Sequence, residues 1–141
     1  MKYSDAELKK RAFERVAYVM RDMWEEKGSS DTRLLIPPLI PDEYVIVGAS
    51  INGKGHKEHV VPRTVICNEC HIMLHDNKSL KEVAAFIQKY LKIVHITKSE
   101  KNRLDKSSEL NLRQRMPEGW SFEDGDIFSR LYEAKIEFIL Y

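Results

Sequence analysis

The sequence has few cysteines, no long apolar run and almost no net charge. Only two of its 141 residues are cysteines, Cys67 and Cys70. They lie too close together in the chain for a disulfide bond between them to stabilise a secreted domain. No stretch approaches the roughly 18 to 20 consecutive apolar residues that a membrane-spanning helix requires. The N-terminal residues lack the apolar run and cleavage site of a secretory signal. We therefore expect a cytoplasmic protein with reduced thiols and no membrane partner.

The charges of the chain nearly cancel, with 23 Lys and Arg residues against 22 Asp and Glu residues. A net charge of +1 provides no long-range attraction for nucleic acid, so any polyanion site must come from local clustering of basic residues. A chain of this length, 43% hydrophobic, can bury its own core. We expect one α+β domain over residues 1–141, without internal repeats.

The clearest helix signal covers residues 4–27, where apolar side chains recur at intervals of three and four. Ser4 and Glu7 have the spacing of a capping box, and Gly28 suits the helix end. The same box spacing recurs at Ser79–Glu82 and Thr97–Glu100, which predicts two further helix starts. The sequence therefore predicts three capped helices.

Strand signals lie between these helices. Residues 44–51 and 57–61 are rich in β-branched residues and flank a Gly-containing turn, which predicts a hairpin. The remaining predictions are an extended proline-rich connection over 29–42, a helical turn or two over 64–75, a strand over 92–96, a helix near 126–135 and a final strand over 136–140. We divide the domain into an N-terminal helix and connection (1–42), a core with a helical insertion (43–106) and a C-terminal turn, helix and strand (107–141).

The strongest chemical signal is the segment Glu58-His59-Val60-Val61-Pro62-Arg63. It places an acid beside a histidine on a predicted strand. Neighbouring strand residues face opposite ways, so Glu58 and His59 cannot both point straight into one pocket unless the strand twists or bulges. We assign His59 the leading role, because a neutral imidazole is the usual group for removing a proton from water near neutral pH.

This segment resembles the HNH, or ββα-metal, nuclease superfamily, whose members carry an acid-histidine pair on the first strand, often followed by a proline. The resemblance implies a strand over 57–61, an insertion over 63–91, a strand over 92–96 and a helix from Ser99, enclosing one divalent metal ion. It covers about a third of the chain. The predicted helix has Lys101-Asn102 where the superfamily usually has histidine.

The resemblance also implies roles for individual residues. His59 would be the general base on the attacking water, and Asn102 would hold Mg²⁺, Mn²⁺ or Zn²⁺ against the scissile phosphate. Glu100 and His95 are alternative or additional metal ligands, and Glu58 would bind the metal or orient a neighbour. Each also has an ordinary structural explanation: Glu100 completes a capping box, Asn102 is an exposed polar residue, and His95 is a half-buried strand residue.

A second cluster places four potential zinc ligands, Cys67, Cys70, His71 and His75, within nine positions. One helix cannot wrap all four residues around an ion, so a closed site needs ligands from elsewhere. We favour the alternative that the two cysteines are small core residues.

Basic residues flank the same predicted core and suit contacts with phosphate. They are Arg63, Lys57, Lys101 and Arg103, with Lys54 and Lys98 nearby. The sequence therefore predicts a metal-dependent nuclease acting on DNA or RNA. The alternative is a non-enzymatic nucleic-acid- or protein-binding regulator, zinc-stabilised through Cys67 and Cys70. A third alternative is a small adaptor that forms a homodimer through the N-terminal helix, with Met20, Met23 and Trp24 partly exposed.

Overall fold

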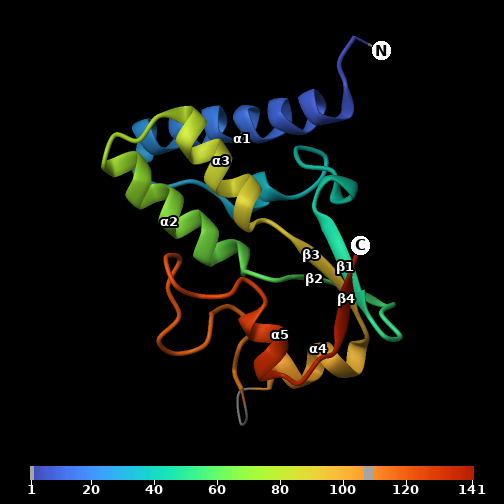
Figure 1. Cartoon of the computed structure of the whole chain (residues 1–141). Coiled ribbons are helices and arrows are strands. Elements are labelled where there is room, and N and C mark those ends of the chain that lie inside the picture. The colour runs from blue at the N-terminus through green and yellow to red at the C-terminus, as the bar shows by residue number, and fades with distance from the viewer. Residues whose placement is uncertain (1, 107–109) are drawn as a thin grey trace.

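The computed structural model describes residues 2–106 and 110–141 and has the predicted mixture of helices and strands. In chain order the elements are α1 (Asp5–Lys27), the 3-10 helices η1 (Thr32–Leu35) and η2 (Asp42–Tyr44), β1 (Ile46–Ser50), β2 (His56–His59), α2 (Arg63–His75), α3 (Leu80–Tyr90), β3 (Ile93–Ile96), α4 (Lys98–Asp105), α5 (Ser129–Glu133) and β4 (Phe138–Leu140) (Figure 1). The predicted α+β class is confirmed.

Three helices begin where the sequence predicts. The side chains of Ser4, Ser79 and Thr97 each accept a hydrogen bond from the backbone N–H three residues later, and the glutamate at that position bonds back to the cap. Each box satisfies two donors that a helix start leaves open, which is worth about 1 kcal/mol. Gly28 ends α1 in the left-handed conformation, with φ of 68°.

The sheet has the strand order β2-β3-β1-β4, so the predicted hairpin of residues 44–61 is wrong. β3 lies between the two segments, parallel to β1 and antiparallel to β2. The sequence could not reveal this pairing, because β3 comes from more than thirty residues further along the chain. β2 is consequently an edge strand.

The connection between β1 and β2 crosses over the end of β3. Gly53 passes so close that a Cβ atom there would lie 2.3 Å from the carbonyl oxygen of His95. Gly55 has φ of +98°, which L side chains rarely adopt. The Gly53-Lys54-Gly55 segment is therefore a crossing that only glycine permits.

The predicted order of strand, insertion, strand and helix is present as β2, α2–α3, β3 and α4. α2 has 13 residues, longer than the expected turn or two. The 29–42 connection is wrong as a fully extended segment, because it forms η1 and the start of η2. α5 is shorter than predicted, and β4 pairs antiparallel with β1 as a member of the sheet.

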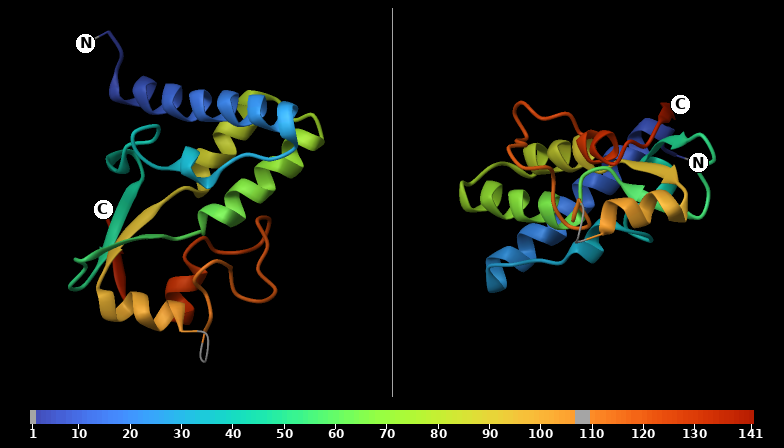
Figure 2. Two further views of the ribbon diagram at one scale, coloured as in Figure 1. Left: turned by 180° about the vertical axis from the view of Figure 1, so that it is seen from behind. Right: turned by 90° about the horizontal axis from the view of Figure 1, so that it is seen from below.

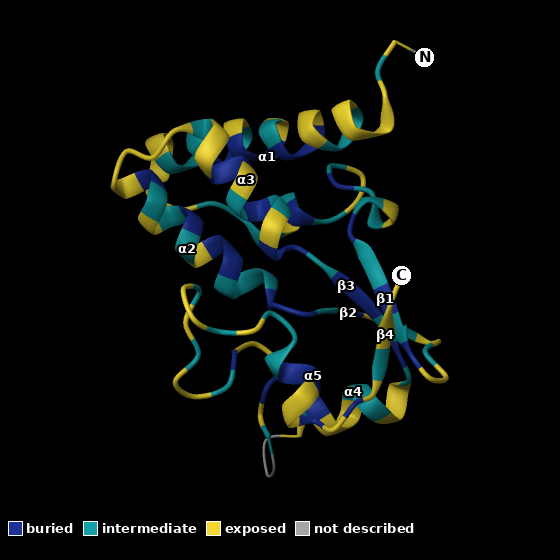
Figure 3. Cartoon of the chain, viewed as in Figure 1, coloured by how far each residue is buried: buried dark blue, intermediate teal, exposed yellow. Residues whose placement is uncertain are grey.

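The helices lie on opposite sides of the sheet region, with α1, α2 and α3 gathered at one end of the molecule and α4 and α5 at the other (Figures 1 and 2). α1 packs mainly on α3. Met20 is completely buried in this layer, so it is not part of an exposed dimer surface. Figure 3 shows the buried residues of α1 on the side that faces the rest of the molecule. Among the described residues, no helix is long and apolar enough to cross a membrane.

Replacing Gly53 with alanine tests the crossing. We expect Gly53→Ala to lower the free energy of unfolding by roughly 1–3 kcal/mol, because the added methyl group meets backbone atoms that cannot move aside easily. Urea unfolding measures the change, with Asn52→Ala in the same exposed loop as the control. Equal stability of the two variants would contradict the close approach.

Candidate functional site

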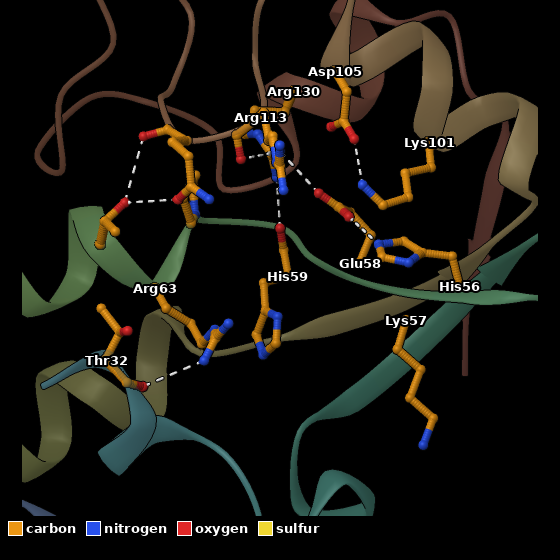
Figure 4. A pocket seen from close by; sticks show the side chains of 13 residues that line it. Thr32, His56, Lys57, Glu58, His59, Arg63, Lys101, Asp105, Arg113 and Arg130 are labelled. Atoms are coloured by element: carbon orange, nitrogen blue, oxygen red, sulfur yellow. Dashed lines mark hydrogen bonds and ion pairs between the residues drawn. The ribbon is translucent and has the colours of Figure 1, made fainter.

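The side chains of β2 alternate between two sides of the strand, as the sequence predicts. Glu58 points toward α4 and α5 together with His56, whereas His59 points the other way, toward Arg63 (Figure 4). A single pocket nevertheless includes both sides of the strand. Its residues are Thr32, His56, Lys57, Glu58, His59, Pro62, Arg63, Thr64, Lys101, Asp105, Arg113, Gln114 and Arg130, and its volume is about 380 Å³.

Glu58 is buried, with 8% of its surface exposed, and both carboxylate oxygens are engaged. Arg130 donates from Nη2 to Oε1 at 2.8 Å, and Nε2 of His56 lies 2.6 Å from Oε2. Arg130 is itself only 1% exposed. Burying either charge alone would cost several kcal/mol, so each requires the other.

Arg130 also binds three backbone carbonyl groups. Its guanidinium donates to Leu112 O at 2.8 Å, to His59 O at 2.6 Å and, more weakly, to Arg113 O at 3.4 Å. These bonds connect α5, the edge of β2 and the segment around residue 112. The fixed fork of the arginine donors is suited to such simultaneous contacts. Arg130 therefore holds the C-terminal segment against β2.

The segment that Arg130 holds brings Arg113 to the pocket. The hydroxyl of Thr64 donates to Oε1 of Gln114 at 3.2 Å, which attaches the same segment to the start of α2. Among the residues that the structure describes, neither Arg63 nor Arg113 has a carboxylate partner. Two arginines thus reach the pocket with their charge uncompensated.

His59 is uncharged at neutral pH. Burial and, after it, the positive charge of Arg63 together lower the pKa of His59 to about 4, although Glu58 opposes the shift. A neutral imidazole has one nitrogen free to accept a proton or a hydrogen bond. An imidazole with so low a pKa is in the unprotonated form that a general base requires, but its affinity for a proton is low.

The first turn of α2 also faces the pocket. α2 begins after Pro62, which provides no side-chain cap, and its first turn contains no acidic residue. Exposed N–H groups and the helix dipole make such an end favourable for an anion. With Arg63 at its first position, the end of α2 adds to the positive potential of the pocket.

The helix that follows β3 presents different residues from those expected. Lys101 and Asp105 line the pocket and form an ion pair with each other, whereas Asn102 is exposed and does not line it. Glu100 completes its capping box and accepts a 2.6 Å hydrogen bond from Ser50. Despite partial burial, which opposes the shift, these hydrogen bonds lower the pKa of Glu100.

The remaining predicted residues lie apart from Glu58. Arg103 lines a separate hollow with Glu100, and His95 lines one at the far end of β2. Of the four predicted phosphate-binding residues, Lys57, Arg63 and Lys101 do line the pocket. The structure thus brings together most of the predicted basic residues but separates the predicted metal ligands.

The donors do not fit a divalent ion bound between strand and helix. Both oxygens of Glu58 are occupied by Arg130 and His56, His59 points away, and the helix offers Lys101 in place of a ligand. Within residues 2–106 and 110–141, no three or more His, Cys, Asp or Glu side chains are grouped to hold a metal. The metal centre stays a prediction.

The four predicted zinc ligands also lie in different surroundings. Cys70 is fully buried in the core, and burial raises the pKa of its thiol to about 12. Nε2 of His71 lies 2.6 Å from Oγ of Ser30 and 3.6 Å from Sγ of Cys67, while His75 is exposed. These positions agree with the expectation that both cysteines are core residues.

Sequence reasoning missed Arg130, Arg113, His56 and Asp105 as members of the site. One signal was present for Arg130: it lies three residues after Ile127 and next to Leu131, on the apolar side of the predicted C-terminal helix. A charged residue on such a face needs a buried partner. Nothing comparable marks Arg113, because its segment has no regular structure.

Removing the guanidinium tests the role of Arg130. We expect Arg130→Met to lower the free energy of unfolding by about 3–5 kcal/mol, because Glu58 is left buried and unpaired. The double variant Arg130→Met/Glu58→Gln should recover part of that loss. Urea unfolding measures both, with exposed Arg103→Ala as the control. If the loss of stability in the double variant equals the sum of the losses in Arg130→Met and Glu58→Gln, the two residues are not coupled and the pairing is contradicted.

Comparison with known proteins identifies no similar protein. No family model matches the chain, and no curated protein or solved structure matches it. The likeness to the ββα-metal superfamily therefore depends on the Glu58-His59 motif and on the order of β2, β3 and α4 alone.

Proposed function

We propose that the protein binds nucleic acid by holding backbone phosphate in the pocket beside β2. The observation that supports this proposal is a pocket lined by five cationic side chains, Lys57, Arg63, Lys101, Arg113 and Arg130. Among the described residues its carboxylates are Glu58 and Asp105, and both are paired. Arginine binds phosphate oxygens in a bidentate manner, which makes the pocket suitable for a phosphate group.

The two unpaired arginines and the start of α2 suit a phosphodiester better than a carboxylate of a small metabolite. They approach from different segments, so they can contact different oxygens of one phosphate. The pocket has few apolar walls for a compact ligand to occupy. A polymer whose sugars and bases extend beyond the pocket fits this arrangement.

Phosphodiester hydrolysis is a second candidate, favoured by the neutral His59 beside Arg63. In this reaction a water oxygen forms a bond to phosphorus, the water proton passes to the imidazole, and the leaving ester oxygen takes a proton from solvent. We rank it second because a base with a pKa of about 4 abstracts a proton from water slowly.

The binding proposal is tested by removing the unpaired charges. We expect Arg63→Ala/Arg113→Ala to weaken binding of a fluorescent oligonucleotide at least tenfold and to reduce the slope of log affinity against log salt by about 1.4 for single strands. Fluorescence anisotropy between low and moderate salt measures both quantities. The control Arg11→Ala/Arg15→Ala makes the same charge change on the exposed side of α1. Equal losses in both variants would indicate net charge instead of a site.

The hydrolysis candidate is tested with labelled DNA and RNA in the presence of Mg²⁺, Mn²⁺, Zn²⁺ or EDTA. We expect any cutting to disappear in His59→Asn while binding persists. The rate should not fall from protonation of His59 until the pH is well below 6, because its pKa is about 4. A cutting activity that survives in His59→Asn would remove this residue from the mechanism.

A further inference from the structure

A second hollow lies next to the pocket at the beginning of β2. Its lining residues are Gly53, Lys54, Gly55, His56, Lys57 and His95, and its volume is about 710 Å³. His56 and Lys57 line both hollows, so the two are adjacent along the edge strand. None of the six residues is acidic.

The glycine crossing determines which side chains gather there. Because Gly53 and Gly55 carry the chain over the end of β3, Lys54 is placed beside His95. A Cβ atom at Gly55 would meet Cγ of Lys98 at 3.5 Å, so the first residue of α4 lies over the same loop. Two segments distant in sequence, residues 53–57 and 95–98, therefore bring basic or imidazole groups to one place.

The strand register relates this hollow to the pocket. Lys57 and His95 are direct cross-strand partners, so their side chains share one side of the sheet. His59, two residues after Lys57, lies on that same side. Lys57, His95 and His59 thus lie along one side of β2, whereas His56 and Glu58 lie on the other side.

We infer that one nucleic-acid strand runs along β2 and places a second backbone phosphate at the hollow beside Lys54, Lys98 and His95. This inference rests on the proposed function, since it extends the ligand of the first pocket. Residues 56–61 span roughly 17 Å at about 3.3 Å per residue. A strand several nucleotides long is therefore needed to reach both positions, whereas a dinucleotide reaches one.

Solvent-exposed lysines usually form an ordinary solvated surface, and Lys57 is already paired with Asp42 at 2.9 Å. That pair is partly exposed, so it contributes little and can exchange for a phosphate. The second phosphate position depends instead on Lys54 and Lys98, for which the described residues include no carboxylate partner.

The test is the length dependence of binding. We expect affinity for single-stranded oligonucleotides to rise steeply between two and about six nucleotides, then level. Lys54→Ala/Lys98→Ala should weaken binding of an eight-nucleotide strand three- to tenfold and reduce its salt slope by about 1.4, while leaving the dinucleotide unchanged. The control Lys78→Ala/Lys81→Ala changes the same charge at exposed positions elsewhere.

The outcomes separate this inference from the function on which it rests. A loss confined to Arg63→Ala/Arg113→Ala, with Lys54→Ala/Lys98→Ala binding like its control, would overturn the second position and leave the first intact. A folded wild-type protein that binds no strand of any length, single or duplex, would overturn both. Circular dichroism of each variant verifies that the loss does not come from unfolding.

Discussion

The buried pair of Arg130 and Glu58 is the interaction on which the site depends. The guanidinium of Arg130 neutralises the carboxylate of Glu58 on β2. It also binds carbonyl groups of β2 and of the segment around residue 112. The attraction alone does not guarantee stability, because desolvating both charges is costly. The pair defines the position of the C-terminal segment on β2, because moving the segment away would leave Glu58 or Arg130 buried without its partner.

The same pair changes what the ββα-like arrangement can do. In the superfamily that the motif resembles, the strand acid and the helix would share a cation from solution. Here Arg130 of the chain itself occupies the acid, and Lys101 on α4 is paired with Asp105. The described residues give Arg63 and Arg113 no carboxylate partner, so the net positive charge of the pocket comes from these two arginines. This charge opposes the binding of a further cation.

The local features of the fold could be predicted from the sequence, and the long-range ones could not. The three capping boxes and the β-branched strand at 92–96 depend on neighbours within four residues, so their patterns are visible in the chain. The place of β3 between β1 and β2 depends on distant pairing. The site divides in the same way: His59 and Arg63 were found through a motif, whereas Arg113 reaches them only through the contacts of Arg130 and Gln114.

The sequence separation of 72 residues between Glu58 and Arg130 has a consequence for the cooperativity of the molecule. If α5 opens locally, Arg113 leaves the pocket at the same moment, so an intact site and a docked C-terminal segment are one thermodynamic state. A ligand that binds only that state stabilises the segment in proportion to the logarithm of its concentration. We therefore expect a ligand in the pocket to slow amide hydrogen exchange in α5, which supplies Arg130 to that pocket.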